Sequence, residues 1–379
     1  MQPMQWTYLD TLTSQGVAAT LQTWRERQPE TGVLALVCEH EPEAVALLQQ
    51  AAVAAAVPLL GAVVPGLIAG AKFWRRGAVL VAFDAATPRR IMAMPHVENR
   101  ATDAAVAALA DFVVAHADDN GGDTLLLLVD ATIPDVASLL DRLYLEIGDQ
   151  VNYTGLCVGS ETFQPVPCLF DDETFMMGAV LALVLRQHPG ATLAHHYHGS
   201  ETLWVTTATT GSHVETIDGR PAFEVYQELM ASEYGIRLDR ENFYRYAAHF
   251  PFALNRAQGE SLVRIPIKVE EDGSVYCAGE VPENALLSVV RAVTPGSLET
   301  AREVGAGVRP AAAAGVLAFY CAGRLMHLDQ AAATAELAAL VEELAPAPLI
   351  GALSLGEIGS GRQQYPAFHN AMIVALPWI

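Results

Sequence analysis

Residues 58–70 read PLLGAVVPGLIAG, and a closely similar stretch, PLIGALSLGEIGS, occupies residues 348–360. A weaker third copy, YTGLCVGSE, spans residues 153–161. Each copy begins as a short apolar run and continues into a segment punctuated by glycine. This pattern is typical of a buried strand that delivers a loop to the rim of a sheet. Related copies within one chain indicate an internally repeated fold.

The sequence around each copy repeats as well. An apolar run lies upstream of every copy, a helical stretch separates the two, and another apolar run follows the glycine segment. The upstream runs are residues 32–38, 124–129 and 315–321, the helical stretches are 41–57, 133–147 and 329–344, and the downstream runs are 77–83, 178–185 and 370–376. We therefore predict an α/β fold of repeated β-α-β-loop-β modules, with layered, largely parallel or mixed sheets and outer helices.

Residues 188–314 differ in character from the repeats. Short β-like runs with Asp-Gly turns at 218–219 and 272–273 predict a β-rich middle segment, interrupted by a helix over residues 221–232. We predict an N-terminal lead over residues 1–31, an N-terminal domain over residues 32–190 and a C-terminal domain over residues 191–379.

The composition limits the classes of function. Acidic residues outnumber basic ones by 43 to 22, and the formal charge is −21, which argues against nucleic acid and anionic membrane surfaces as partners. Five widely separated cysteines without a CxxC pair indicate a reduced, cytoplasmic chain. The sequence shows neither a signal peptide nor an apolar run of the ~18–20 residues that a membrane span needs.

Standard phosphate-binding and metalloprotease signatures are absent: the sequence has no GxxxxGK[ST], no GxGxxG that opens a helix and no HExxH. The clearest cluster of potential ligands is His195-His196-Tyr197-His198. In a strand, His196 and His198 would share one face, which suits a metal ion or an axial haem ligand. The alternative is a partly exposed polar loop.

A second candidate is Ser354 in the run Ala-Leu-Ser-Leu-Gly, a variant of the hydrolase nucleophile elbow. Such an elbow needs a strand, a sharp turn and then a helix, whereas GSGRQQYP follows here. Glu357 is too close in sequence for the usual catalytic triad on separate loops. Acyl transfer by Ser354 is therefore the alternative to a binding function.

Polar residues gather at the predicted strand ends of the third module. Because carboxyl ends of strands form the rim where ligands bind in α/β layers, Arg324, Ser354, Glu357 and Asn370 are candidate ligand-binding residues. Cys157 and Ser160 mark the corresponding rim of the second module. The alternative for Arg324 and Glu357 is that they pair with each other and fix the loops.

These motifs resemble the FIST family (F-box and intracellular signal transduction). Its C-terminal half carries CAGR, GEIG and HN in order, matched here by residues 321–324, 356–359 and 369–370. The resemblance covers nearly all of residues 30–379. This chain departs from the family pattern at Pro65 and Leu67, and it has HHYHGSE where the family has a Trp-Pro-Gly stretch.

The resemblance implies a sensory, ligand-binding role rather than catalysis. Such a chain would signal to a separate partner, such as a histidine kinase or a diguanylate cyclase or phosphodiesterase, and amino-acid-like ligands have been proposed for the family. Some stand-alone members bind haem and sense nitric oxide. If haem binds here, we expect the ligand to come from His195, His196 or His198, because this run supplies several imidazoles in one short segment; the second choice is His249 in the aromatic-rich stretch FYRYAAHFPF.

Overall fold

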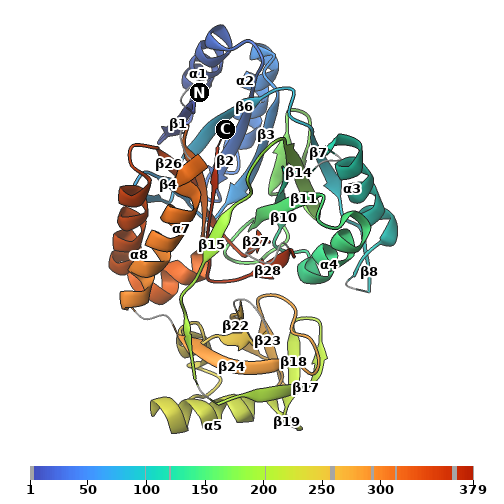
Figure 1. The fold of residues 1–379 in the computed structure, drawn as a ribbon, viewed down its shortest axis with the longest axis vertical. Coiled ribbons are helices and arrows are strands. Elements are labelled where there is room, and N and C mark those ends of the chain that lie inside the picture. The colour runs from blue at the N-terminus through green and yellow to red at the C-terminus, as the bar shows by residue number, and fades with distance from the viewer. Residues whose placement is uncertain are drawn as a thin grey trace.

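The computed structural model describes residues 4–98, 100–118, 121–200, 202–256, 261–291, 294–311, 314–360 and 365–378, with side chains at 294 and 295 left out. It has two parts, which Figure 1 shows one above the other. The larger part, here called the α/β core, contains three six-stranded sheets and most of the helices. The smaller part, here called the β lobe, comprises residues 198–291 and contains the nine-stranded sheet.

Each predicted module contains a parallel pair of strands connected by a helix. The three modules are β2 (Thr31–Cys38), α2 (Ala44–Ala55) and β3 (Leu59–Val64); β10 (Asp123–Asp130), α4 (Val136–Ile147) and β11 (Val151–Val158); and β25 (Val316–Cys321), α8 (Ala322–Leu344) and β26 (Leu349–Ser354). The downstream apolar runs form antiparallel neighbours of β2, β10 and β25, namely β6 (Ala78–Asp84), β14 (Ala179–Leu185) and β29 (Ile373–Pro377). The predicted α/β class and its repeated modules are thereby confirmed.

The hydrophobic pattern of α4 explains its position. Its buried residues repeat at helical spacing and face the sheet, while Gly148 ends the helix with a φ of +58°. They are Val136, Leu139, Leu140, Leu143 and Ile147. The third helix starts earlier than the predicted residue 329, because α8 begins directly after β25 and is broken at Asp329, where φ is +65°.

The glycine segments, which the sequence predicts to be loops, enter short hairpins that are exchanged among the modules. The first module's hairpin, β4 (Leu67–Ala69) with β5 (Phe73–Trp74), joins β26 of the third module. The second module's hairpin, β12 (Leu169–Asp171) with β13 (Phe175–Met176), joins β3 of the first. The third module's hairpin, β27 (Glu357–Gly359) with β28 (Ala367–His369), joins β11 of the second. Each sheet is therefore completed by another module.

Close backbone approach explains the repeated glycine in these pairs of strands. A Cβ atom would lie 2.0 Å from the Leu127 carbonyl oxygen at Gly155 and 1.7 Å from the Ala318 carbonyl oxygen at Gly351. Any side chain would therefore push the parallel strands apart.

The remaining core elements extend the sheet edges, cover the sheet faces or, in the case of β8 and β9, form a separate two-stranded sheet. They are β1 (Trp6–Leu9), β7 (Arg89–Ala93), β8 (His96–Val97), β9 (Arg100–Ala101) and β15 (Thr192–Ala194), the helices α1 (Ser14–Arg27), α3 (Asp103–His116) and α7 (Thr294–Val308), and the 3₁₀ turn Arg309–Ala311. Two large apolar clusters fill the spaces between these layers.

The β lobe confirms the predicted β-rich middle segment. Its strands are β16 (His198–Gly199), β17 (Trp204–Thr210), β18 (His213–Ile217), β19 (Arg220–Pro221), β20 (Phe252–Leu254), β21 (Leu262–Arg264), β22 (Pro266–Val269), β23 (Val275–Cys277) and β24 (Leu286–Arg291). Its helices are α5 (Ala222–Tyr234) and α6 (Phe243–Ala247), and it has its own apolar core. The chain enters the lobe at β16 and leaves it at β24, and these two strands pair with each other.

Candidate functional site

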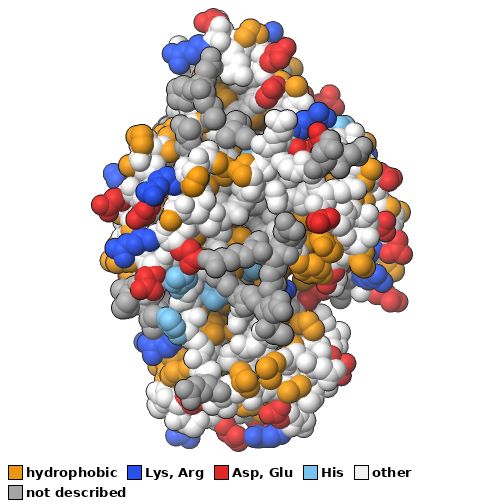
Figure 2. All heavy atoms as spheres, viewed as in Figure 1, with side chains coloured by type: hydrophobic (Ala, Val, Ile, Leu, Met, Phe, Trp, Pro, Cys, Tyr) orange, Lys and Arg blue, Asp and Glu red, His pale blue; other side chains and the backbone are white. Residues whose placement is uncertain are grey.

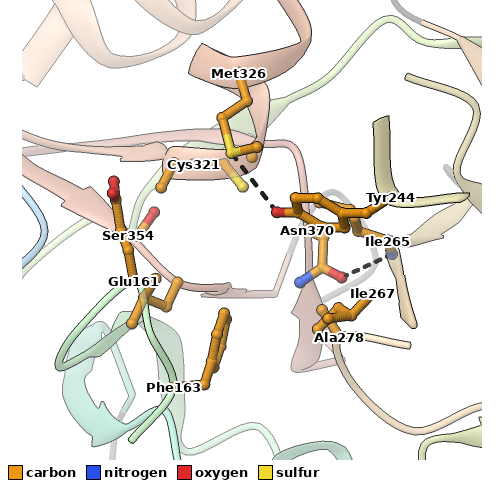
Figure 3. A pocket seen from close by; sticks show the side chains of 13 residues that line it. Glu161, Phe163, Tyr244, Ile265, Ile267, Ala278, Cys321, Met326, Ser354 and Asn370 are labelled. Atoms are coloured by element: carbon orange, nitrogen blue, oxygen red, sulfur yellow. Dashed lines mark hydrogen bonds between the residues drawn. The ribbon is translucent and has the colours of Figure 1, made fainter. Parts of the chain in front are cut away.

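A cavity of about 200 Å³ lies between the α/β core and the β lobe. The core contributes the start of α8, the ends of β25 and β26, the residues before β29 and the loop after β11, while the lobe contributes α6, β22 and their surroundings. The lining residues are Glu161, Phe163, Tyr244, Ile265, Ile267, Ala278, Cys321, Ala322, Gly323, Met326, Ser354, Leu355 and Asn370 (Figure 3). The carboxyl ends of parallel strands thus form one wall, as expected for an α/β layer.

A second cavity of about 160 Å³ adjoins the first. Phe163, Ile267, Ala278 and Leu355 line both, and Cys157 lines the second. Thr132, Ser212 and Tyr276 add hydroxyl groups to its wall. We refer to the two cavities together as the cleft.

Ser354 and Glu357 form a hydrogen-bonded pair beside the first cavity. Both are fully buried, and the Ser354 hydroxyl donates to Glu357 Oε1 at 2.5 Å. The Met372 backbone N–H donates to Glu357 Oε2 at 3.2 Å, and the Cys321 thiol also bonds to this carboxyl. Burial nevertheless raises the pKa of Glu357 to about 8, because removing a carboxylate from water disfavours its charged form.

Arg324 is also fully buried, but its partner is Glu336 and not Glu357. Its Nε and Nη2 atoms donate to the two Glu336 oxygens at 2.8 and 2.5 Å. The remaining donors bond to the carbonyl oxygens of His195 and Ala371, both at 2.9 Å, and to the Thr300 hydroxyl at 3.0 Å. All five guanidinium N–H groups are therefore used within the protein.

The other rim residues occupy different positions. Asn370 lines the first cavity, and its Oδ1 accepts from the Ile265 backbone N–H of the β lobe at 3.4 Å (Figure 3). Cys157 is buried, and burial raises the pKa of its thiol well above the usual value. Ser160 is half-buried and bonds to the Thr162 hydroxyl at 2.9 Å in the loop after β11. The structure thus brings Ser354, Asn370 and Cys157 to the walls of the cleft, whereas Glu357 lies behind Ser354, and Arg324 and Ser160 line neither cavity.

The four candidate histidines are spread around the connection between the two parts. His195 is buried, its Nδ1 accepts from the Tyr197 N–H, and its Nε2 lies 3.1 Å from the Ser261 carbonyl oxygen. His196 Nε2 lies 2.5 Å from Glu303 Oε2. His198 is exposed in β16, and the exposed His249 has its ring 5.9 Å from that of His327. Figure 2 shows histidine side chains near this junction on the face drawn.

This arrangement does not supply a ready haem site. Both ring nitrogens of His195 have protein partners, and none of the four histidines lines the cleft. Across the part of the chain that the structure describes, no group of three or more His, Cys, Asp or Glu side chains could hold a metal ion. Haem ligation by His195, His196, His198 or His249 stays a prediction.

The lobe residues of the cleft were absent from the predicted site. Tyr244, Ile265, Ile267 and Ala278 lie far from the glycine repeats in sequence. The signals were the aromatic-rich stretch 243–252, which contains Tyr244, and the Arg-Ile-Pro run 264–266, which contains Ile265. Neither run shows from sequence alone that it faces the strand ends of another part of the molecule.

Two family models match almost the whole chain. The FIST N domain matches residues 32–220, and the FIST C domain matches residues 222–360. The chain belongs to the FIST family. FIST domains are typically non-catalytic, sensory modules of signal transduction, so this protein is a FIST sensory and signalling protein. The domain boundary predicted at residues 190/191 stays a prediction.

A search of curated proteins returned no match. None of the described helices is long and apolar enough to cross a membrane.

Proposed function

We propose that this FIST protein binds a small organic ligand in the cleft and signals its presence to a separate protein, such as a histidine kinase or a cyclic-dinucleotide enzyme. The observation that carries the proposal is the cleft itself, whose walls come from both the α/β core and the β lobe. Small-molecule sites are commonly concave, mainly apolar and supplied with a few polar groups. Ser354, Asn370 and Tyr276 supply such groups here.

The connection between the α/β core and the β lobe would allow ligand binding to change how the two parts lie relative to each other. Chain entry and exit meet where His198 and Gly199 pair with Arg291 and Val290. A ligand that contacts both parts would stabilise the arrangement in which they lie closest. The partner would respond to that shift in population, because a ligand moves an equilibrium only by binding one state better.

The surroundings of Ser354 favour binding over acyl transfer. The Ser354 hydroxyl donates to Glu357, which burial keeps mostly protonated below about pH 8, so at neutral pH few molecules carry a carboxylate that could take the serine proton. The segment after β26 continues into β27 rather than into the helix of a nucleophile elbow. Hydrolase or acyltransferase activity through Ser354 is the alternative proposal.

A thermal-shift screen of a small-molecule panel tests the ligand-binding proposal. Ala278→Phe fills the cleft from a position that lines both cavities, and Ala231→Phe adds the same ring at an exposed position of α5. We expect ligands that stabilise the wild type and the Ala231 variant and fail with the Ala278 variant. Circular dichroism checks that both variants fold. Ligands that stabilise all three proteins equally would contradict a site in the cleft.

Haem binding is a separate proposal with its own test. Ultraviolet-visible spectra of protein expressed with haem supplied would show a Soret band if haem binds. Single alanine variants of His195, His196, His198 and His249 would identify the ligand by loss or shift of that band. A band unchanged in all four variants would exclude these residues as ligands.

A further inference from the structure

The loop after β11 breaks the internal repeat at the cleft. In the first and third modules, only Pro65-Gly66 and Leu355-Gly356 separate the second parallel strand from its hairpin. In the second module, residues 159–168 lie between β11 and β12. This longer loop supplies Glu161 and Phe163 to the cleft. The only module with an extended loop therefore places it over the candidate site.

Contacts with the first module hold the loop in place. Glu161 Oε1 lies 2.6 Å from Arg75 Nη1, and the Glu161 backbone N–H donates to Glu39 Oε2 at 3.1 Å. Phe163 follows with a φ of +52°, which is uncommon for an aromatic residue, and its N–H donates to the Ser160 carbonyl oxygen. Unfavourable backbone conformations of this kind concentrate at functional sites.

Phe163 lies at the boundary between the two cavities. It lines both, together with Ile267, Ala278 and Leu355. Figure 3 shows Phe163 and Ala278 on the side of the first cavity opposite Met326 and Cys321. The Phe163 residue is 41% exposed, so its ring is not locked in a packed core. Among the shared residues, Phe163 belongs to the extended loop, whereas Ile267 is part of β22.

The cleft offers almost no charge to a ligand. Glu161 is the single charged residue among the described residues that line the two cavities, and Arg75 already pairs with it. The start of α8 would favour an anion, but the Cys321 thiol lies against the backbone N–H groups of Gly323 and Arg324. Arg324 itself is fully bonded within the protein.

We infer that the cleft takes an uncharged, elongated and mainly apolar molecule with hydrogen-bonding groups, and that Phe163 sets the length the site accepts. This inference rests on the proposed function and specifies its ligand class. A charged ligand would lose its hydration without gaining a free counter-charge, which is unfavourable. A short ligand would occupy one cavity, and a longer one would have to displace the Phe163 ring to reach the second.

Three probes with one aromatic frame test both parts of the inference. Neutral 1-naphthylamine is short, neutral N-phenyl-1-naphthylamine is long, and 1-anilinonaphthalene-8-sulfonate has the long frame with an anionic group. Fluorescence titration and competition give each Kd for the wild type, Phe163→Ala and Val166→Ala. Val166 is a matched control, because it is an exposed apolar residue of the same loop that is absent from both cavity walls.

We expect the wild type to bind the long neutral probe at least about tenfold more tightly than the sulfonate, a difference of about 1.4 kcal/mol. In Phe163→Ala, the ratio of the Kd of the long neutral probe to the Kd of the short probe should fall about tenfold, because the long probe no longer has to displace the ring. In Val166→Ala, this ratio should stay unchanged. Equal or tighter binding of the sulfonate would overturn the ligand class. Equal ratios in the two variants would overturn the role of Phe163.

The failure of this inference can be distinguished from that of the proposed function. If none of the neutral probes binds while the thermal-shift panel still yields ligands that Ala278→Phe abolishes, the ligand class is wrong and the cleft remains a binding site. If no molecule of any class binds the wild type, both the inference and the proposed function are wrong.

Discussion

Two buried polar clusters near the cleft differ in charge: one contains an ion pair, and the other contains a carboxyl without a cationic partner. In the first, Arg324 and Glu336 form an ion pair with every guanidinium donor satisfied. In the second, Glu357 accepts from Ser354 and Met372 without a cationic partner, and burial raises its pKa to about 8. The first cluster holds the framework together, whereas the second places a neutral carboxyl next to the cavity wall.

This difference indicates that one buried charged residue stabilises the fold and the other positions a group at the candidate site. Arg324 of α8 donates hydrogen bonds to the carbonyl oxygen of His195, in the connection to the β lobe, and to that of Ala371, before β29. Its guanidinium group therefore stabilises the fold. Glu357 holds the Ser354 hydroxyl, which lines the cavity. The Ser354 hydroxyl therefore faces the cavity next to a neutral carboxyl. This arrangement suits recognition of a ligand by hydrogen bonds rather than by charge. The predictions below probe this difference in order of expected effect.

The largest effect is expected from Glu336→Gln, because it leaves Arg324 charged and buried without its partner. Breaking a buried pair in this way typically costs about 3–5 kcal/mol of stability. Urea denaturation should show that loss, and the exposed Glu342→Gln on the same helix should stay within about 0.5 kcal/mol of the wild type. A loss below about 1 kcal/mol in the Glu336 variant would contradict the structural role of this cluster.

Glu357 predicts a characteristic pH dependence of stability. Its pKa is raised on folding to about 8, so between its unfolded pKa and pH 8 the folded state holds a proton that the unfolded state lacks. Stability should therefore fall as pH rises through this range. Burial lowers the pKa values of His195 to about 4 and of His327 and His369 to about 3, and it also lowers the pKa of His188. These four groups have the opposite effect on stability, which fades above pH 6.5 as the histidines of the unfolded chain lose their protons.

The window for Glu357 is pH 6.5 to 8, and its contribution there is read as the difference in stability between the wild type and Glu357→Gln, because both proteins share the contribution of the histidines. The contribution of Glu357 over this window should be a loss of about 1–2 kcal/mol, measured by urea denaturation at each pH. Glu357→Gln should remove that contribution, because the amide stays neutral at every pH. The same slope in wild type and variant would show that Glu357 is not the titrating group.

A smaller effect is expected from Ser354→Ala, which removes one hydrogen bond to Glu357. The loss should be about 1 kcal/mol, and the pH midpoint assigned to Glu357 should move upward, because the hydroxyl favours the charged form. Ser232→Ala is the matched control on the surface of α5.

A hydrolase screen on the same proteins tests the alternative proposal of catalysis by Ser354. Turnover that Ser354→Ala abolishes without loss of folding would favour the acyl-transfer alternative.

The sequence predicted the modules because their signals are local. Apolar runs and the periodic face of α4 are read directly from neighbouring residues. The exchange of hairpins was not predictable in this way, since the partner of β27 is β11, about two hundred residues earlier in the chain. Similarly, Glu336 reaches Arg324 only because the helix breaks at Asp329, and a regular helix would have directed the two side chains differently.

Only the part of the candidate site that has local sequence signals was predicted. Ser354 ends β26, Glu357 begins β27 and Asn370 follows β28, and sequence patterns locate such strand ends well. The opposite wall depends on how the β lobe packs against the core, as with Ile267 and Ala278, and a single sequence carries no local signal for such packing.

Hydrogen-deuterium exchange by mass spectrometry tests the central claim most directly, with and without a ligand selected by the thermal-shift screen. A ligand in the cleft should protect segments of both parts together: residues 159–168 and 321–326 of the core, and residues 264–279 of the β lobe. The Ala278→Phe variant should show no ligand-dependent protection. Protection confined to one part, or located away from these segments, would contradict a sensor site between the α/β core and the β lobe.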